Sequence, residues 1–160
     1  MSKQKVIICH DLNENLRSAI ASCPHDKLFI LVDEHTRQLC LPLIADMECM
    51  QQAYIITIGA EDIHKNLETL AYVWKELGDH GATRHSLMIN LGGGMVTDLG
   101  GFAASTFKRG IPYINIPTTL LAMVDASVGG KTGINFNGLK NEIGVFSPAE
   151  YVLLDTEFLK

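Results

Sequence analysis

Two short apolar runs in the middle of the chain each stop at residues that favour a tight turn. Residues 87–91 are followed by three glycines, residues 92–94, and then by a helical pattern. Residues 113–116 are followed by a Pro-Thr-Thr segment. Apolar runs of this length, bounded by turn residues, are typical of strands buried on both faces of a parallel sheet. These junctions favour a fold in which strands and helices alternate.

The rest of the chain fits the same alternation. Further strand-like runs occupy residues 6–9, 28–32, 54–58 and 151–154. Helical patterns lie between the runs, at residues 13–22, 35–47, 62–77, 95–108 and 119–126. Strands that alternate with helices form βαβ units. We therefore expect an α/β, Rossmann-like fold, with a mostly parallel sheet and helices on both of its faces.

Details of the helical patterns predict local features. Pro42 lies inside the 35–47 pattern and predicts a break there. Gly100 and Gly101 weaken the 95–108 helix, so we expect them at a close approach to a strand or ligand. The clearest apolar stripe belongs to the 62–77 pattern and comprises Leu67, Leu70, Ala71, Trp74 and Leu77.

Composition and charge narrow the function classes. The chain has 160 residues, of which 47% are hydrophobic, so one domain with a real core is expected. Its formal net charge is -5 without a basic stripe, which argues against a nucleic-acid partner. No apolar run is long enough to cross a bilayer, and the N-terminus does not resemble a signal peptide. The four cysteines lack a metal-type spacing, so we expect reduced thiols and a cytoplasmic protein.

Polar residues and glycines collect where the predicted strands end. Ligands of open α/β sheets bind beyond the carboxyl ends of the strands. The residues found there are Asp33, Asp62, the segment 92–98, Thr118 and Thr119. The sequence therefore predicts a ligand site at this edge of the sheet.

Each of these groups also has a purely structural interpretation. The glycines before the helix could bind a pyrophosphate, or could form a plain strand-to-helix turn. Asp98 could accept hydrogen bonds from a ribose or carboxamide, or could complement the helix dipole. Asp33 could hold a ribose, but from sequence alone a helix N-cap is favoured.

The lysines and histidines give weaker signals. The segment SVGGKTG is not a P-loop, because Asp125 stands where that motif requires glycine, and a helical pattern precedes the segment. Lys131 and Lys140 are still suited to an anionic substrate, and Asn141 adds an amide. The six histidines are scattered without a metal spacing, so we expect no complete metal site within this chain.

Two long segments carry a family resemblance. They read GGGMVTDLGGFAASTFKRG and IPTTLLAMVDASVGGKTGINFNGLKN. Their motifs, order and spacing closely resemble those of the 3-dehydroquinate synthase family, which belongs to the sugar phosphate cyclases. Glycerol dehydrogenases share the fold and a GGG loop, but the PTTLLAMVD and SVGGKTG motifs resemble the cyclase branch.

The resemblance implies an activity. The family binds NAD and converts 3-deoxy-arabino-heptulosonate 7-phosphate into 3-dehydroquinate and phosphate, as a lyase of the shikimate pathway. A divalent metal, zinc or cobalt, and a homodimer are also implied. The family's metal ligands lie in a C-terminal domain, so the resemblance implies that residues 1–160 are the N-terminal NAD-binding domain and that this second domain is absent. Open alternatives are another sugar phosphate cyclase, such as a 2-deoxy-scyllo-inosose synthase, and a non-catalytic nucleotide-binding module.

The resemblance also assigns roles to residues. It places Gly93, Gly94 and Met95 at the pyrophosphate, and Asp33, Asp62 and Lys65 at the adenosine end. The family pattern usually has Glu at position 62 and Asn at position 35, where this chain has Asp62 and His35. Further cofactor contacts are implied for Asp98, Thr118, Thr119, Lys131 and Lys140.

Substrate residues are implied by the same resemblance. Asp125, Lys131 and Asn141 would face the substrate and take part in catalysis. Arg109 would bind a substrate phosphate across a dimer. No metal ligand is assigned within the chain.

Overall fold

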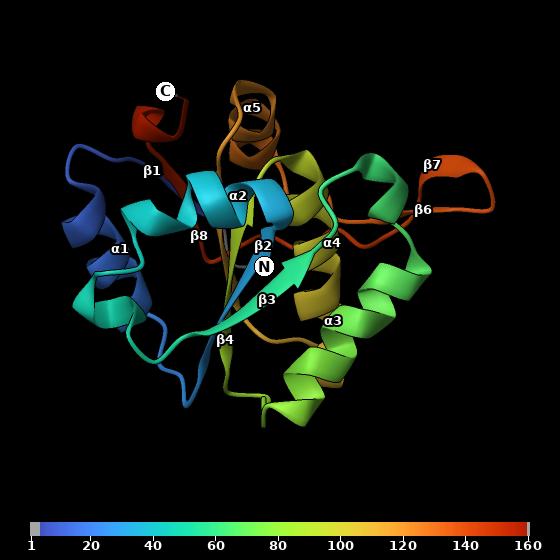
Figure 1. Cartoon of the computed structure of the whole chain (residues 1–160), viewed down its shortest axis with the longest axis horizontal. Coiled ribbons are helices and arrows are strands. Elements are labelled where there is room, and N and C mark those ends of the chain that lie inside the picture. Colours follow the sequence, from blue (N-terminus) through green and yellow to red (C-terminus); the bar gives the residue numbers. More distant parts are fainter. Residues whose placement is uncertain (1–3, 160) are drawn as a thin grey trace.

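The computed structural model describes residues 4–159, apart from the side chains of residues 127 and 128. Within these residues, six parallel strands form one sheet in the order β1-β8-β5-β4-β2-β3 (Figure 1). The strands are β1 (Lys5–Ile8), β2 (Leu28–Asp33), β3 (Tyr54–Ile58), β4 (Leu87–Gly92), β5 (Tyr113–Pro117) and β8 (Tyr151–Leu154).

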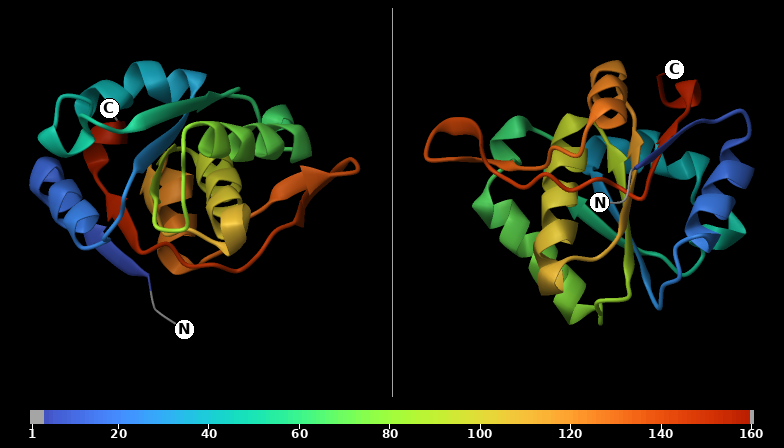
Figure 2. Two further views of the ribbon diagram at one scale, coloured as in Figure 1. Left: turned by 90° about the horizontal axis from the view of Figure 1, so that it is seen from below. Right: turned by 180° about the vertical axis from the view of Figure 1, so that it is seen from behind.

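Helices cover both faces of this sheet, so the predicted fold class is confirmed. Figure 2 shows the blue and cyan helices on one side of the sheet and the green and yellow helices on the other. The first layer contains α1 (Leu12–Ala21), α2 (Glu34–Leu39), η1 (Leu41–Leu43) and η2 (Glu48–Met50). The second layer contains α3 (Leu67–Asp79), α4 (Gly94–Thr106) and α5 (Leu120–Val128).

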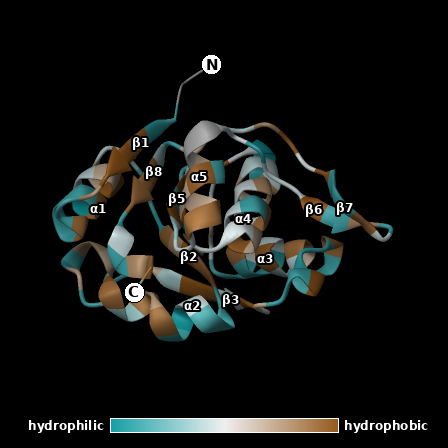
Figure 3. Ribbon diagram, turned by 90° about the horizontal axis from the view of Figure 1, so that it is seen from above, coloured by the Kyte–Doolittle hydropathy of each residue, from teal (hydrophilic) through white to brown (hydrophobic). Residues whose placement is uncertain are grey.

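Each helix layer packs on its own apolar core. The central strands β2 and β4 are buried at every position, as expected for continuous apolar runs in a parallel sheet. Apolar residues accordingly concentrate along the strands, between the two helix layers (Figure 3). Among the described residues, no helix combines the length and the apolar character that a bilayer crossing requires.

The helix predicted at residues 62–77 begins later than expected. Residues Asp62–His64 form the short 3-10 helix η3, and α3 starts only at Leu67. The reason is a cap, because the Asn66 side chain accepts a hydrogen bond from the Thr69 N–H at 2.9 Å. The buried stripe also differs: Leu70, Val73 and Leu77 are buried.

Of the other stripe residues, Leu67 and Ala71 are exposed and Trp74 is half-buried.

The break predicted at Pro42 is confirmed, because α2 ends at Leu39 and Pro42 lies in η1. Other short helices are η4 (Phe107–Arg109) and η5 (Thr156–Leu159).

An antiparallel hairpin, β6 (Ile134–Phe136) and β7 (Leu139–Ile143), was not anticipated from the sequence. Asn137 and Gly138 connect its strands and both have positive φ, at 53° and 77°. Asn-Gly is the dipeptide that best tolerates this conformation in a two-residue turn. The signal was therefore present, although the flanking strands are short. The hairpin extends beyond α3 at one end of the molecule (Figure 1).

The two glycines inside α4 lie where the helix approaches its neighbours closely, as predicted. A Cβ atom at Gly100 would lie 2.1 Å from Asn90 Oδ1 on β4 and 2.9 Å from Leu31 Cδ2 on β2. A Cβ atom at Gly101 would lie 2.6 Å from Thr132 Cγ2. These glycines let α4 pack closely against the sheet on one side. On the other side they let it pack against Thr132, which precedes the β6–β7 hairpin.

We predict that Gly100→Ala destabilises the protein by roughly 1–3 kcal/mol, because the added methyl group overpacks a site with no room. The matched control is Gly78→Ala in α3, where a Cβ atom would meet nothing within 4 Å. That change should stabilise the protein by roughly 0.5–1 kcal/mol. Urea unfolding measures both, and equal effects of the two variants would contradict the close approach.

Candidate functional site

The sheet has a switch point between β2 and β4. The chain leaves β2 toward α2 on one face, and leaves β4 toward α4 on the other face. Connections that diverge in this way open a crevice at the carboxyl ends of the strands. The predicted residues Asp33, Gly93 and Thr118 lie at this edge, where β2, β4 and β5 end.

The N-terminus of α4 lacks a side-chain cap. The described helices α1, α2, α3 and α5 are capped by Asp11, Asp33, Asn66 and Thr119. At α4 the N-cap is Gly93, which has no side chain to accept from the first N–H groups. An uncapped helix start combines unpaired N–H donors with the positive end of the helix dipole. It is therefore suited to bind an anion.

The glycines before α4 have different steric roles. A Cβ atom at Gly92 would lie 2.6 Å from Val96 Cγ2, so the turn itself requires glycine there. At Gly93 the nearest atom, Thr119 Cγ2, would lie 3.4 Å away, and at Gly94 nothing lies within 4 Å. The packing of this chain therefore explains Gly92, would admit a Cβ atom at Gly93 in ordinary contact with Thr119, and leaves open space over Gly94.

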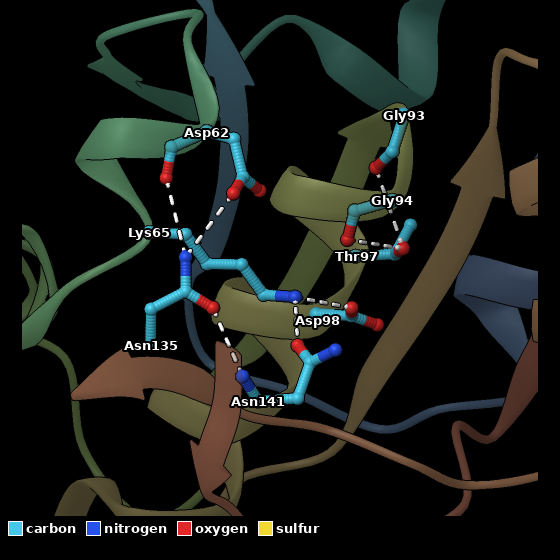
Figure 4. Close-up of polar contacts among 8 residues, drawn as sticks. All are labelled: Asp62, Lys65, Gly93, Gly94, Thr97, Asp98, Asn135 and Asn141. Atoms are coloured by element: carbon cyan, nitrogen blue, oxygen red, sulfur yellow. Dashed lines mark hydrogen bonds and ion pairs between the residues drawn. The ribbon is translucent and has the colours of Figure 1, made fainter. Parts of the chain in front are cut away.

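The buried side chain of Lys65 contacts two other elements, α4 and β7. Its contact on α4 is Asp98, one turn after Gly94. Lys65 follows η3 and is only 5% exposed. Its Nζ donates a hydrogen bond to Asp98 Oδ2 on α4 at 2.8 Å and another to Asn141 Oδ1 on β7 (Figure 4). Residues predicted for the cofactor and the substrate thus meet at one ammonium group.

The hairpin is attached to η3 by a second set of hydrogen bonds. The Asn135 N–H donates to the backbone oxygen of Lys65 at 2.8 Å, and its Nδ2 donates to Asp62 Oδ2 at 3.2 Å. Asn135 Oδ1 in turn accepts from the Asn141 N–H at 3.0 Å. Figure 4 shows the side-chain contacts of Asn135 with Asp62 and with Asn141.

Burial raises the pKa of the Asp98 carboxyl above its ordinary value, an effect that exceeds the opposing effect of the Lys65 ammonium. The negative charges of Asp125 and Asp62 raise this pKa further. A higher pKa in the folded state means that ionisation of Asp98 opposes folding. Its contribution to stability is complete below the unfolded-state pKa of about 3.9 and is lost as the pH rises through the folded-state value.

A cleft of about 650 Å³ lies between α4, α5 and the segment 129–146, which contains the β6–β7 hairpin. Five residues with predicted roles line it together: Gly94, Asp98, Asp125, Lys131 and Asn141. Asn115 on β5 also lines the cleft and was not predicted. Its Oδ1 accepts from Asn90 Nδ2 at 3.0 Å, and both amides are buried. The signal for this pair was an asparagine inside each of two apolar strands.

Other predicted residues lie outside the cleft. The Asp33 carboxylate accepts from the Thr36 N–H at 2.8 Å in a capping box, which confirms its N-cap role. Thr118 is buried, Thr119 caps α5, and Met95 is half-buried against the α3–α4 core. The ligand roles of these residues remain predictions.

Two predicted cations are exposed at the surface. Lys140 lies on β7. Arg109, with φ of 71°, follows the end of α4 opposite to Gly94. Among the described residues, no cluster of three or more histidine, cysteine or acidic side chains is placed to hold a metal ion.

The family model for the N-terminal part of 3-dehydroquinate synthase matches residues 55–160. The 3-dehydroquinate synthase of Parabacteroides distasonis is 56% identical over 160 residues, which are 100% of this chain and 45% of that protein. The enzyme of Pyrococcus furiosus is 42% identical over 156 residues, which are 96% of this chain and again 45% of the relative. The chain belongs to the 3-dehydroquinate synthase family.

Solved structures of related cyclases share the fold. A 2-deoxy-scyllo-inosose synthase superimposes with a TM-score of 0.87 at 25% identity, over 96% of this chain and 44% of that one. The 2-epi-5-epi-valiolone synthase of Streptomyces hygroscopicus, solved with NAD⁺ and Zn²⁺, gives 0.85 at 33% identity over 99% of this chain and 44% of that one. This member of the 3-dehydroquinate synthase family thus spans less than half the length of its relatives.

We predict that Lys65→Met raises the pKa of Asp98 further, because methionine removes the cation that favours the ionised carboxylate. A ¹³C NMR titration of the carboxyl carbons measures this. Lys75→Met is the control, because Lys75 pairs with Asp79 on the exposed face of α3 and should not affect Asp98. An Asp98 pKa that stays the same or falls in Lys65→Met would show that the ion pair does not form in solution.

Proposed function

We propose that this chain is the NAD-binding domain of a 3-dehydroquinate synthase, with the cofactor pyrophosphate bound over Gly93 and Gly94. The observation that carries the proposal is the uncapped start of α4 beneath open space. Both features suit a group that carries negative charge and must approach the backbone closely. The 56% identical relative and the NAD-bound valiolone synthase support the same assignment.

We propose that the whole protein converts 3-deoxy-arabino-heptulosonate 7-phosphate into 3-dehydroquinate and phosphate. This places it among the phosphate-eliminating lyases of the shikimate pathway, in the cytoplasm. When bound, NAD supplies reversible hydride transfer at a substrate carbinol. The described residues do not provide a metal site, so the zinc or cobalt ion of the proposal requires ligands from elsewhere.

The residues of the cleft can position a sugar. A lysine can only donate hydrogen bonds, so the Lys65 contact fixes Asn141 Oδ1 toward Lys65. The Asn141 amino group is then the part of this amide that can donate to a substrate oxygen. Asp125 can accept from sugar hydroxyls, and the Lys131 ammonium can stabilise an anionic oxygen. Asp98 can accept from the cofactor carboxamide.

Arg109 lies about 20 Å along α4 from Gly94, given a rise of 1.5 Å per residue. Arg109 is not among the residues that line the cleft of its own chain. We propose that Arg109 binds the substrate phosphate in a second copy of the protein, as the family resemblance implies, and this is the reason for proposing a homodimer.

The second candidate is a different sugar phosphate cyclase. The observation in its favour is the fit to 2-deoxy-scyllo-inosose synthase, with a TM-score of 0.87. The sequence identity to that protein is only 25%, against 56% to a 3-dehydroquinate synthase. We therefore favour the heptulosonate phosphate as the substrate.

We predict that Gly93→Val weakens NAD binding about tenfold or more, because the new side chain fills the space proposed for the pyrophosphate. The fold should be retained, since the nearest atom to a Cβ at Gly93 is an ordinary 3.4 Å away. Calorimetric titration measures the affinity and circular dichroism the fold. Gly78→Ala, on exposed α3, should bind NAD normally. Equal affinities of all three proteins would remove the pyrophosphate assignment.

We predict that this chain alone does not release phosphate from the heptulosonate phosphate, even with NAD and zinc present. Metal-assisted oxidation needs about three converging ligands, and a water-excluding second wall. The assay is phosphate release by the chain alone and together with the C-terminal half of the Parabacteroides relative. Zinc-dependent turnover by the lone chain would contradict the prediction that catalysis requires the C-terminal half. No turnover by the mixture with this substrate, but turnover with glucose 6-phosphate, would favour the second candidate.

A further inference from the structure

Lys65 is a charged group that has been removed almost completely from water. Its 5% exposure makes the ammonium costly to bury unless partners compensate for the lost hydration. The two side-chain partners are Asp98 and Asn141, which are 33 and 76 residues away in the sequence. A buried cation with such distant partners joins segments that local structure would leave independent.

Both partners of Lys65 belong to the cleft. Asp98 and Asn141 line the 650 Å³ space together with Asp125 and Lys131. The adenosine end of the cofactor is expected elsewhere, at the end of β2 beside Asp33. The Lys65 side chain therefore points toward the opposite, substrate-facing part of the site.

The conformation of Asn141 is held by contacts from two residues. Asn141 has φ of 53°, in the left-handed region, which asparagine adopts more readily than most other residues with a side chain. Two contacts hold it there: its N–H donates to Asn135 Oδ1, and its own Oδ1 accepts from Lys65. Asn135 is itself held by the Lys65 backbone oxygen. Lys65 thus supports Asn141 directly through its side chain (Figure 4) and indirectly through its backbone oxygen, which holds Asn135.

We propose that Lys65 is a positioning residue, which holds Asn141 and the β6–β7 hairpin against α4 and so sets the substrate-facing wall of the cleft. This assigns Lys65 a place in the site different from the adenosine contact that the family resemblance implies. The inference rests on the proposed function, because the wall is called substrate-facing on that ground.

The first experiment uses amide hydrogen exchange of the chain without ligand. In Lys65→Met the Asn135 and Asn141 N–H groups should exchange about tenfold faster or more, because the hairpin loses its attachment. The Val73 N–H, inside α3, should not change, which separates this effect from general unfolding. Lys65→Gln keeps a donor without the charge and should give a smaller increase. Lys75→Met should give none.

A double variant tests whether Lys65 acts through Asn141. Asn141→Ala should raise exchange at Asn135, and adding Lys65→Met should raise it little further, because both changes remove the same contact. Fully additive effects would show that the two residues act separately, and would overturn the proposal.

The second experiment compares NAD with ADP-ribose, which has the adenosine and pyrophosphate but lacks the nicotinamide. In Lys65→Met, calorimetry should show an NAD affinity about fivefold lower or more, because Asp98 and Asn141 are displaced at the nicotinamide side. The ADP-ribose affinity should change less than about twofold. Lys75→Met should leave both affinities unchanged.

The outcomes separate this proposal from the proposed function. Failure of the unchanged chain to bind either ligand would remove the NAD-binding function. The exchange experiment would still report on the contact between Lys65 and Asn141. Equal losses of affinity for NAD and ADP-ribose in Lys65→Met would indicate that Lys65 acts at the adenosine end of the cofactor. Unchanged exchange at Asn135 and Asn141, or faster exchange with both affinities unchanged, would equally overturn the positioning role.

Discussion

The close contact between α4 and the sheet determines where the site lies. Gly100 lets the helix backbone rest on the Asn90 side chain of β4, and Gly101 lets the segment at Thr132 cross its other side. A helix held on two sides has a fixed direction and a fixed start. The uncapped N–H groups at Gly93 and the carboxylate of Asp98 are therefore presented in fixed positions without direct help from a ligand.

Two glycines of the SVGGKTG segment, Gly130 and Gly133, lie at close backbone contacts. A Cβ atom at Gly130 would lie 2.8 Å from the backbone of Pro148, and one at Gly133 would lie 2.8 Å from the backbone oxygen of Ile143. The Gly133 N–H also donates to the Asp98 backbone oxygen at 3.1 Å. A segment that resembles a phosphate loop in composition is therefore built from close backbone contacts. Its lysine, Lys131, is left exposed at the cleft.

Strands were predictable because burial on both faces leaves a continuous apolar run. The fully buried strands β2 and β4 each extend one residue beyond the predicted runs. The partly buried strands β3 and β8 have the predicted bounds. The start of α3 was not predictable from periodicity, because a single cap at Asn66 decides it and the apolar pattern does not. The hairpin was missed because β6 has only three residues and β7 is exposed throughout, so neither strand carries an apolar run, and the signal lay in the Asn-Gly turn.

The site was predictable at the level of one edge of the sheet. Parallel strands bring their ends together, so residues after β2, β4 and β5 had to be neighbours. The partners of Lys65 could not be predicted in the same way, because they depend on how the hairpin folds back over α4. Asp33 shows the opposite case, in which a local rule identified the structural role, the cap of α2, before any ligand was considered.

The charges of the cleft constrain how the proposed sugar phosphate substrate would lie in it. Among the described lining residues, Asp98, Asp125 and Glu142 are acidic and Lys131 is basic, while Lys65 offsets part of the charge of Asp98. Carboxylates accept hydrogen bonds from hydroxyl groups and repel a phosphate. This wall therefore suits the polyol part of a sugar phosphate, and the phosphate needs cations from outside it. That requirement agrees with the proposed contribution of Arg109 from a second copy, because Arg109 follows the end of α4 opposite to Gly94 and does not line the cleft of its own chain.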